Sequence, residues 1–534
     1  MARRFFWSIV ALAILSGGVF RVLHVEHRML WSDESWTALR ISGHFYGDVT
    51  RLFDGRRHSA AQLLDLQRPT GAPMSATVSG LAQEEPQHPP LFYLLDRAWA
   101  QRFGSSIADL RLPALLFGLA AMLAVSWFCF ELTGSTVVAG SAAALMAVSP
   151  FFVNYSAQAR EYTLWATGVS ACSALLLQAL RRPSALRWTA YAVAMALALY
   201  ADVLMLAVLA GHVAFVFSTR YRDRRVLAGY ASAAGIATAL FLPWLIICIR
   251  ARSAISADES WTYTTYPLQL FIEKWCFNIG SVLFDAEYGN MRLLAIAIAM
   301  MLLIVYAVVR MFRDEKPATA WFVAAPALTI ALPALLIDVL VRAHASTEPR
   351  YLVPLWIALL VAVAVFFGRR ITSDGVVRNV PWLAGFCVVL VLQAASSAGS
   401  SGASMWWDNQ DHYPSTSIAE RIDAAGPSPL VVSAGPAPEV LVMSHYVPID
   451  SQFLLLPDHG HLPHHLKRDT FLLTPSVATL AELRAGSAYS ITPIPVTELA
   501  SAALTGFHRQ LRSGAAASRP TPVPLFRIQE RSHT

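Results

Sequence analysis

Two adjacent carboxylates, Asp33 and Glu34, lie between two tryptophans in the run WSDESW (31–36), a few residues beyond the first long apolar stretch. Acids close to a membrane are costly to place, so their presence favours a functional role. Neighbouring carboxylates raise one another's pKa, and one can then act as a base near neutral pH or recruit a cation. The alternative is structural, because acids at a helix N-terminus complement the helix dipole. We take both as candidate catalytic residues.

The second candidate is the run EEPQHPPL (84–91), in which three prolines fix the backbone around one histidine and two acids. A protonated His88 could bind a phosphate, whereas a neutral His88 could ligate a metal ion together with Glu84 and Glu85. The alternative is a histidine that only caps a proline-rich turn. The acids and His88 remain a possible metal site at this point.

Two arginines each stand beside an acid and a tyrosine, in AREY (159–162) and EPRY (348–351). The planar guanidinium groups of Arg160 and Arg350 offer a fork for phosphate or carboxylate. A salt-bridge network is the alternative for both. The neighbouring candidates for substrate binding are Glu85, Glu161, Tyr162 and Tyr351.

The composition places these residues in a membrane protein. The chain has 534 residues, 55% hydrophobic and 14% charged, and a mean hydropathy of +0.47, whereas charged residues make up about a quarter of a soluble domain. Disordered, fibrous and disulfide-stapled classes are excluded. The net charge of +6 comes from short basic runs between apolar stretches, a pattern typical of cytoplasmic loops, so a nucleic-acid partner is excluded as well.

About eleven apolar stretches are long enough to cross roughly 30 Å of hydrocarbon. They lie at 5–24, 113–131, 137–153, 163–180, 187–201, 203–219, 227–249, 291–311, 318–341, 351–368 and 379–398. If each one crosses, the basic runs fall on one side, which the positive-inside rule makes cytoplasmic. We read the first stretch as an uncleaved anchor, which puts the N-terminus in the cytoplasm and the C-terminus outside.

Three segments are then expected outside the membrane. Residues 26–112 form an outer loop with interfacial helices, one capped by Ser59 and one opened by Pro90. Residues 250–290, rich in aromatic side chains, are expected to form an outer flap. We assign 1–400 to a transmembrane catalytic domain and 401–534 to a small α/β domain. Its expected elements are strands at 430–435, 440–447 and 470–474 and helices at 417–425 and 478–484.

These motifs in this order resemble the polytopic glycosyltransferases of the GT-C superfamily, in the branch of the protein O-mannosyltransferases, lipid A aminoarabinose transferases and rhizobial lipopolysaccharide galacturonosyltransferases. Asp33-Glu34 resembles the acidic pair of that family, and residues 87–95 (QHPPLFYLL) its HPPL-type motif. Arg111-Leu112-Pro113 and the stretch from Ser149 to Tyr162 resemble the landmarks that follow. The resemblance covers roughly the first two hundred residues.

The resemblance implies a hexosyl- or pentosyltransferase of the bacterial cytoplasmic membrane that uses a polyprenyl-phosphate sugar and an extracytoplasmic acceptor (glycolipid, glycan or protein). Asp33 would deprotonate the acceptor hydroxyl, and one displacement would invert the anomeric carbon. Arg160, Arg350 and protonated His88 would stabilise the leaving phosphate. Some relatives carry lysine where His88 stands, which leaves metal ligation open. We expect no cofactor, with a divalent cation as the alternative.

Two other classes compete with a transferase. A lipid-linked oligosaccharide transporter or polymerase would share the span count, but we find none of the inverted repeats or midplane charges typical of transporters. A sensor would need a cytoplasmic output domain, and no expected cytoplasmic loop exceeds about a dozen residues.

Overall fold

The chain forms two compact units. The structure is a computed structural model, and it describes residues 2–23, 25–286, 291–372, 376–404, 406, 415–457, 462, 466, 470–475, 479–480, 483–484, 489–494 and 525–530. The membrane unit comprises Met1–Val25, Leu81–Leu95 and Arg111–Ala403. The sheet unit comprises Glu26–Gly80, Asp96–Leu110 and Ser404–Thr534. This grouping differs from the predicted division at residue 400, because most of the first outer loop packs with the C-terminal segment.

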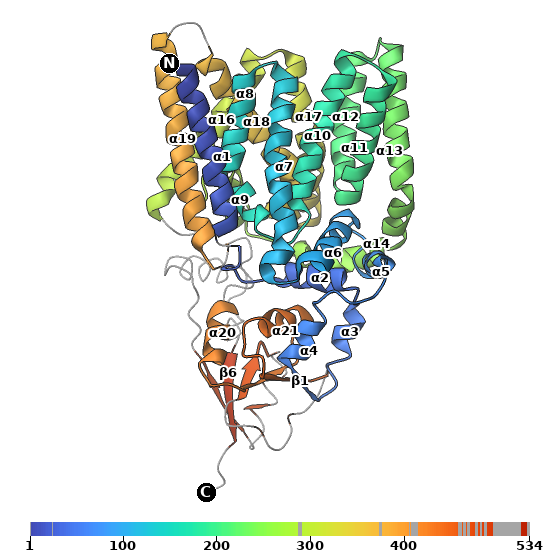
Figure 1. Cartoon of the computed structure of the whole chain (residues 1–534), viewed down its shortest axis with the longest axis vertical. Coiled ribbons are helices and arrows are strands. Elements are labelled where there is room, and N and C mark those ends of the chain that lie inside the picture. Colours follow the sequence, from blue (N-terminus) through green and yellow to red (C-terminus); the bar gives the residue numbers. More distant parts are fainter. Residues whose placement is uncertain are drawn as a thin grey trace. The chain divides into compact units, whose positions relative to one another are not determined.

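The chain is a multi-pass membrane protein, as expected. Eight helices in the described ranges are long and apolar enough to cross a membrane, and they run side by side in the membrane unit (Figure 1). They are α1 (Ala2–Leu23), α7 (Ile107–Thr133), α10 (Tyr162–Arg181), α13 (Arg224–Arg250), α16 (Met291–Asp314), α17 (Pro317–Val341), α18 (Val353–Ile371) and α19 (Val376–Gly402).

The other three predicted spans are helical but irregular or short. Helices α8 (Thr136–Ala147) and α9 (Pro150–Ser156) form one apolar pair bent by 60°, which would make a ninth span. Helices α11 (Ala185–Ala201) and α12 (Met205–Arg220) are apolar, with 17 and 16 residues. The number of eleven crossings therefore stays a prediction.

The bend between α8 and α9 is held by a buried arginine of α1. A helix that stops inside an apolar bundle leaves carbonyl groups without partners, and these must be satisfied by another group. Arg21 donates from Nη1 to the carbonyl of Ala147 (2.6 Å) and from Nε to the hydroxyl of Ser156 (3.0 Å). The guanidinium group thereby joins the end of α8, the end of α9 and its own helix.

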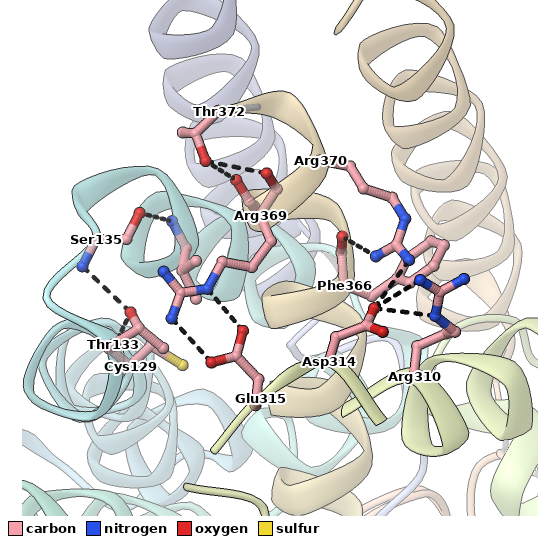
Figure 2. Close-up of polar contacts among 12 residues, drawn as sticks. Cys129, Thr133, Ser135, Arg310, Asp314, Glu315, Phe366, Arg369, Arg370 and Thr372 are labelled. Carbon is pink, nitrogen blue, oxygen red and sulfur yellow. Dashed lines mark hydrogen bonds and ion pairs between the residues drawn. The ribbon is translucent and has the colours of Figure 1, made fainter. Parts of the chain in front are cut away.

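Ion pairs fasten the turn between α16 and α17 to the C-terminal end of α18 (Figure 2). Arg369 binds both carboxylate oxygens of Glu315 (2.7 and 2.9 Å). Asp314 accepts from Arg310 (2.9 Å) and Arg370 (3.3 Å). Two of the basic runs that the charge rule placed on one side of the membrane thus lie together at one end of the bundle.

The sheet unit contains a six-stranded sheet of order β1-β3-β2-β4-β6-β5, parallel at its centre and antiparallel at both edges. The strands are β1 (Arg57–Ser59), β2 (Leu430–Ser433), β3 (Gln452–Leu455), β4 (Thr470–Leu473), β5 (Tyr489–Pro493) and β6 (Leu525–Glu530). All four residues of β2 are buried. Parallel strands covered on both faces read as continuous apolar runs, which is why 430–435 was recognisable.

The small α/β domain is confirmed, with one wrong element. Residues 440–447, predicted as a strand, belong mostly to helix α21 (Ala437–Ser444), because a short apolar run does not distinguish a strand from a buried helix and Pro438 opens its first turn. The predicted strand at 470–474 is β4, and the predicted helix at 417–425 is α20 (Ser415–Asp423). The helix predicted at 478–484 lies partly outside the described residues.

The first outer loop is helical, as expected. It contains α2 (Ser32–Ser42), α3 (Tyr46–Thr50), α4 (Ala60–Asp65), α5 (Met74–Glu84) and α6 (Leu91–Phe103). Ser59 caps α4 by accepting from the backbone N–H of Gln62 (3.2 Å), and α6 begins directly after Pro90. The predicted flap consists of α14 (Arg252–Asp258), the 3-10 turn η1 (Glu259–Tyr263) and α15 (Leu268–Ser281). Two further 3-10 turns, η2 (Ala345–Thr347) and η3 (Pro349–Leu352), precede α18.

We predict that Gly17→Ala destabilises the protein and that Gly18→Ala does not. A Cβ at Gly17 would lie 2.1 Å from the carbonyl oxygen of Ala147, whereas a Cβ at Gly18 would meet nothing within 4 Å. Overpacking of this kind costs about 1–3 kcal/mol, and both variants share the same gain in helix propensity. Thermal unfolding of the purified variants in lipid nanodiscs should give a lower Tm for Gly17→Ala alone. Equal Tm values would contradict the close crossing of α1 and α8.

Candidate active site

Three candidate residues from two separate motifs meet in the membrane unit and form a cluster (His88, Arg160 and Glu161), called here the histidine–arginine cluster. Nδ1 of His88 lies 2.7 Å from Oε1 of Glu161. Nη2 of Arg160 lies 3.1 Å from Nε2 of His88 and 3.4 Å from Oε1 of Glu161. Arg160 and Glu161 are buried, and His88 keeps 20% of its side chain exposed. The cluster is therefore reachable from solvent only at the imidazole.

The proline-rich turn that carries His88 is fixed from two sides. The carbonyl of Pro86 accepts from Nε1 of Trp244 (3.0 Å) and from the thiol of Cys248 (3.1 Å), both on α13. The amide of Gln87 donates to Asp258 at the end of α14 (2.7 Å). Prolines restrict the backbone between these contacts, so the imidazole is held with little freedom. On the other side, Glu161 occupies the N-cap position of α10.

The charges of the cluster are set by mutual contact. Burial raises the pKa of Glu161, but the positive charge of Arg160 and then His88 outweigh burial and lower this pKa to about 2. Burial and Arg160 lower the pKa of His88, yet Glu161, with a contribution from Glu85, raises it above the ordinary value of 6.5. In the neutral imidazole, Nδ1–H donates to Glu161 and Nε2 accepts from Arg160. Protonation of Nε2 adds a positive charge beside Arg160, which suits an anionic ligand.

Asp202 joins this group electrostatically, although the sequence assigned it no role. It is buried in the turn between α11 and α12, where Oδ1 accepts from the backbone N–H of Leu204 (2.8 Å). Burial and the charge of Glu161 raise its pKa to about 7, against the opposing effects of His88 and Arg160. The only sequence signal was an acid between two apolar helices.

Arg350 lies in a second polar group of the membrane unit, together with residues of the flap. Glu348 accepts contacts from both Arg350 and Lys274, each at 3.5 Å. The guanidinium group of Arg350 lies over the ring of Trp261 (5.2 Å). Lys274 of α15 was not recognised in the sequence, because an isolated lysine among aromatic residues carries no pattern.

The tyrosines of the two arginine motifs have different partners. The hydroxyl of Tyr351 donates to Oε2 of Glu259 in η1 (2.8 Å). The ring of Tyr162 lies 5.8 Å from Cζ of Arg160. Tyr351 therefore joins the EPRY motif to the flap, and Tyr162 lies beside the histidine–arginine cluster.

The acidic pair belongs to the sheet unit, where both residues lie in the first turn of α2. Asp33 is half-buried and Glu34 is fully buried, so Glu34 is not a solvated helix-end charge. Asp96 of α6, which the sequence did not single out, is fully buried as well. Burial and the charge of Glu34 raise the pKa of Asp96 well above its usual range. Two buried carboxyl groups are thus close enough to interact.

The present partners of His88 bear on the possible metal site. In the part of the chain that the structure describes, no three His, Cys, Asp or Glu side chains are grouped as metal ligands would be, including Glu84, Glu85 and His88. Both ring nitrogens of His88 already face Glu161 and Arg160. A metal at His88 would have to displace Arg160.

The fold defines a polytopic membrane protein, and the histidine–arginine cluster places a buried charged group within its bundle. Residues 87–247 match the family model described as dolichyl-phosphate-mannose-protein mannosyltransferase. The structure is similar to that of ArnT from Cupriavidus metallidurans in the apo state, with a TM-score of 0.53, 12% identity, and coverage of 92% of this chain and 96% of that chain. The likeness extends over nearly the whole of both chains, so the chain shares the fold of this structure.

Two further solved structures are similar at lower scores. ArnT from Cupriavidus metallidurans bound to undecaprenyl phosphate has a TM-score of 0.49 and 14% identity, over 84% of this chain and 86% of that chain. The oligosaccharyltransferase AglB from Archaeoglobus fulgidus, in complex with an inhibitory peptide and a dolichol-phosphate, has a TM-score of 0.49 and 14% identity. The likeness covers 84% of this chain and 64% of that chain. No curated protein matches the sequence.

We predict that Glu161→Gln lowers the pKa of His88 below 6.5. The substitution removes the charge that raises this pKa and leaves burial and Arg160, which both lower it. The measurement is the pH dependence of His88 modification by diethyl pyrocarbonate, which reacts with the neutral imidazole, read by mass spectrometry. The midpoint should shift to lower pH in Glu161→Gln and stay unchanged in Glu420→Gln, which alters an exposed glutamate of α20. An unchanged midpoint in both variants would contradict the ion pair.

Proposed function

We propose that the protein is a membrane glycosyltransferase that moves a sugar from a polyprenyl-phosphate-linked donor to an extracytoplasmic acceptor. The carrying observation is the histidine–arginine cluster, a buried arginine–glutamate ion pair with one solvent-reachable imidazole in a multi-pass bundle. ArnT, whose fold the chain shares, has been crystallised with undecaprenyl phosphate. A lipid-linked phosphate is the ligand that combines a membrane anchor with the charge this cluster accommodates.

The cluster would act on the leaving group. As the bond between the anomeric carbon and the phosphate oxygen breaks, negative charge accumulates on the phosphate, and preorganised cations in a buried site stabilise it strongly. Arg160 is held in place by Glu161 and by the ring of Tyr162, so little reorganisation is needed. Arg350 offers a second guanidinium group, which is held in place by its ion pair with Glu348.

Asp33 would act as the base, and Glu34 would position it or the acceptor. Deprotonation of the acceptor hydroxyl by Asp33 allows attack on the anomeric carbon opposite the phosphate, and a single displacement inverts that carbon. The half-exposed position of Asp33 leaves it accessible to an acceptor, whereas the neighbouring Glu34 is fully buried. The transferred sugar is a hexose or a pentose. The protein lies in the bacterial cytoplasmic membrane with the N-terminus inside and the C-terminus outside.

Transfer by the purified protein tests this proposal. Reconstituted protein is supplied with polyprenyl-phosphate sugars and with an extract of envelope glycolipids, and transfer is followed by mass spectrometry. Asp33→Asn should lower turnover by about 10²–10⁴-fold, as loss of a general base commonly does. The matched control is Asp423→Asn, an exposed carboxylate of α20, which should keep full turnover. No transfer by the parent protein would overturn the function, and normal turnover in Asp33→Asn would overturn the role of Asp33.

We further propose that transfer needs no metal ion. Two arginines are available for charge neutralisation, and the imidazole is engaged by Arg160 and Glu161. Turnover should persist after exhaustive chelation, and Mg²⁺ or Mn²⁺ added back should leave it unchanged. Activity that disappears with chelation and returns with one ion would instead assign Glu84, Glu85 and His88 to that ion.

A further inference from the structure

The sheet unit contains a cavity that lies apart from every residue discussed so far. Its volume is about 320 Å³. The cavity lies between the end of α4, the turn that joins α6 to α7, and the end of α21, and its lining residues are Leu64, Gln67, Arg68, Ser105, Ser106 and His445. Ligand pockets span about 300–1,000 Å³, so this one has the size for a single small ring.

One wall of the cavity is a preorganised amide–imidazole pair. Gln67 is 2% exposed, and its amide nitrogen donates to the carbonyl of Leu441 (3.2 Å) and to the hydroxyl of Ser444 (3.3 Å). These contacts fix the orientation of the amide. Its Oε1 therefore faces Nε2 of His445 at 3.0 Å and accepts a hydrogen bond from the imidazole N–H. The amide nitrogen also donates to the carbonyl of Leu63 (3.3 Å), so Gln67 has four partners, its polar atoms are satisfied, and it holds the imidazole in a fixed orientation.

The lining also includes a cation and hydroxyl groups. The Arg68 side chain forms one ion pair among the described residues, from Nη1 to Asp65 (3.0 Å), which leaves Nε and Nη2 for a ligand. Ser105 is half-buried at the cavity, and Ser106 is fixed by Asp109, which accepts from its backbone N–H (3.1 Å) and hydroxyl (2.7 Å).

This combination of groups matches one ligand chemistry. Hydroxyl, amide and imidazole groups can bind the hydroxyls of a sugar, and Leu64, which also lines the cavity, supplies an apolar side chain suited to the C–H surface of a pyranose ring. The guanidinium fork adds bidentate recognition of a carboxylate or a phosphate. A neutral sugar would use only part of this lining.

We propose that the cavity binds one anionic sugar unit, a pyranose ring that carries a carboxylate or a phosphate, of the acceptor glycan. That the ligand belongs to the acceptor rests on the proposed function. The binding of an anionic sugar does not, because it can be measured without transfer. The site would hold the acceptor through a recognition unit distinct from the attacking hydroxyl.

Direct binding to the full chain tests the site. The probes are glucose 6-phosphate, glucuronate and glucose, measured by saturation-transfer NMR on protein in lipid nanodiscs, since sugar detergents would compete. The parent should bind the two anionic sugars more tightly than glucose, and their ratio shows whether phosphate or carboxylate is preferred. Arg68→Gln should weaken the anionic sugars by roughly tenfold or more and leave glucose unchanged.

Two further variants complete the design. Leu64→Trp fills the cavity and should abolish binding of all three probes. Arg56→Gln removes another exposed arginine of the sheet unit, which pairs with Asp54 as Arg68 pairs with Asp65, and should bind as the parent does. Because Arg68 is exposed, its variant remains informative if Leu64→Trp fails to fold.

The outcomes separate the two proposals. Equal binding of glucose and the anionic sugars by the parent, parent-like binding by Arg68→Gln, or equal losses in Arg68→Gln and Arg56→Gln would each overturn the site. Binding as described without sugar transfer by the parent would overturn the proposed function and leave the site standing. With transfer present, Arg68→Gln should raise the KM for the acceptor at unchanged kcat.

Discussion

The contact of the buried Glu161 carboxylate with His88 and Arg160 is the interaction on which the histidine–arginine cluster depends. Removing a charge from water is costly, and the cost is recovered only while both cations stay within contact distance. The 2.7 Å contact to His88 therefore requires that the proline-rich turn keep its place, which the contact of Trp244 with the carbonyl of Pro86 provides. Loss of either cation would leave a buried negative charge. The two motifs are consequently coupled in folding although 73 positions separate His88 from Glu161.

The backbone that presents Arg160 depends on a second buried cation. Arg160 follows α9, whose direction is set by the 60° bend after α8. The bend exposes carbonyl groups in an apolar environment, and Arg21 satisfies that of Ala147 while binding Ser156 at the end of α9. An apolar residue at position 21 could fill the space but could not donate these bonds. The charge of Arg21 is thus structural, and it supports the backbone from which Arg160 extends.

The sequence predicted what local patterns encode and missed what only packing creates. Hydropathy located every helical segment of the bundle, and motif chemistry singled out His88, Arg160 and Arg350. The meeting of His88 with Glu161 could not be predicted, because it depends on how α6 and α10 are placed in three dimensions. Asp96 and Asp202 were missed for the same reason, since a lone acid gains its significance from burial and from the charges around it. The strand predicted over 440–447 was wrong because an eight-residue apolar run fits a buried helix equally well.

A histidine at position 88 makes the charge of the cluster adjustable, which a lysine would not. Glu161 is ionised and Arg160 is cationic, so the pair is neutral and one proton on His88 decides between a net charge of zero and a net positive charge. Under the proposed reaction, a donor phosphodiester with one negative charge becomes a phosphate monoester that carries up to two. A protonated His88 favours both the donor and the charge that develops when the bond breaks. Loss of that proton to the product would return the cluster to neutrality and weaken its hold on the spent lipid phosphate. Binding and release then follow from one titratable ring placed between two fixed charges.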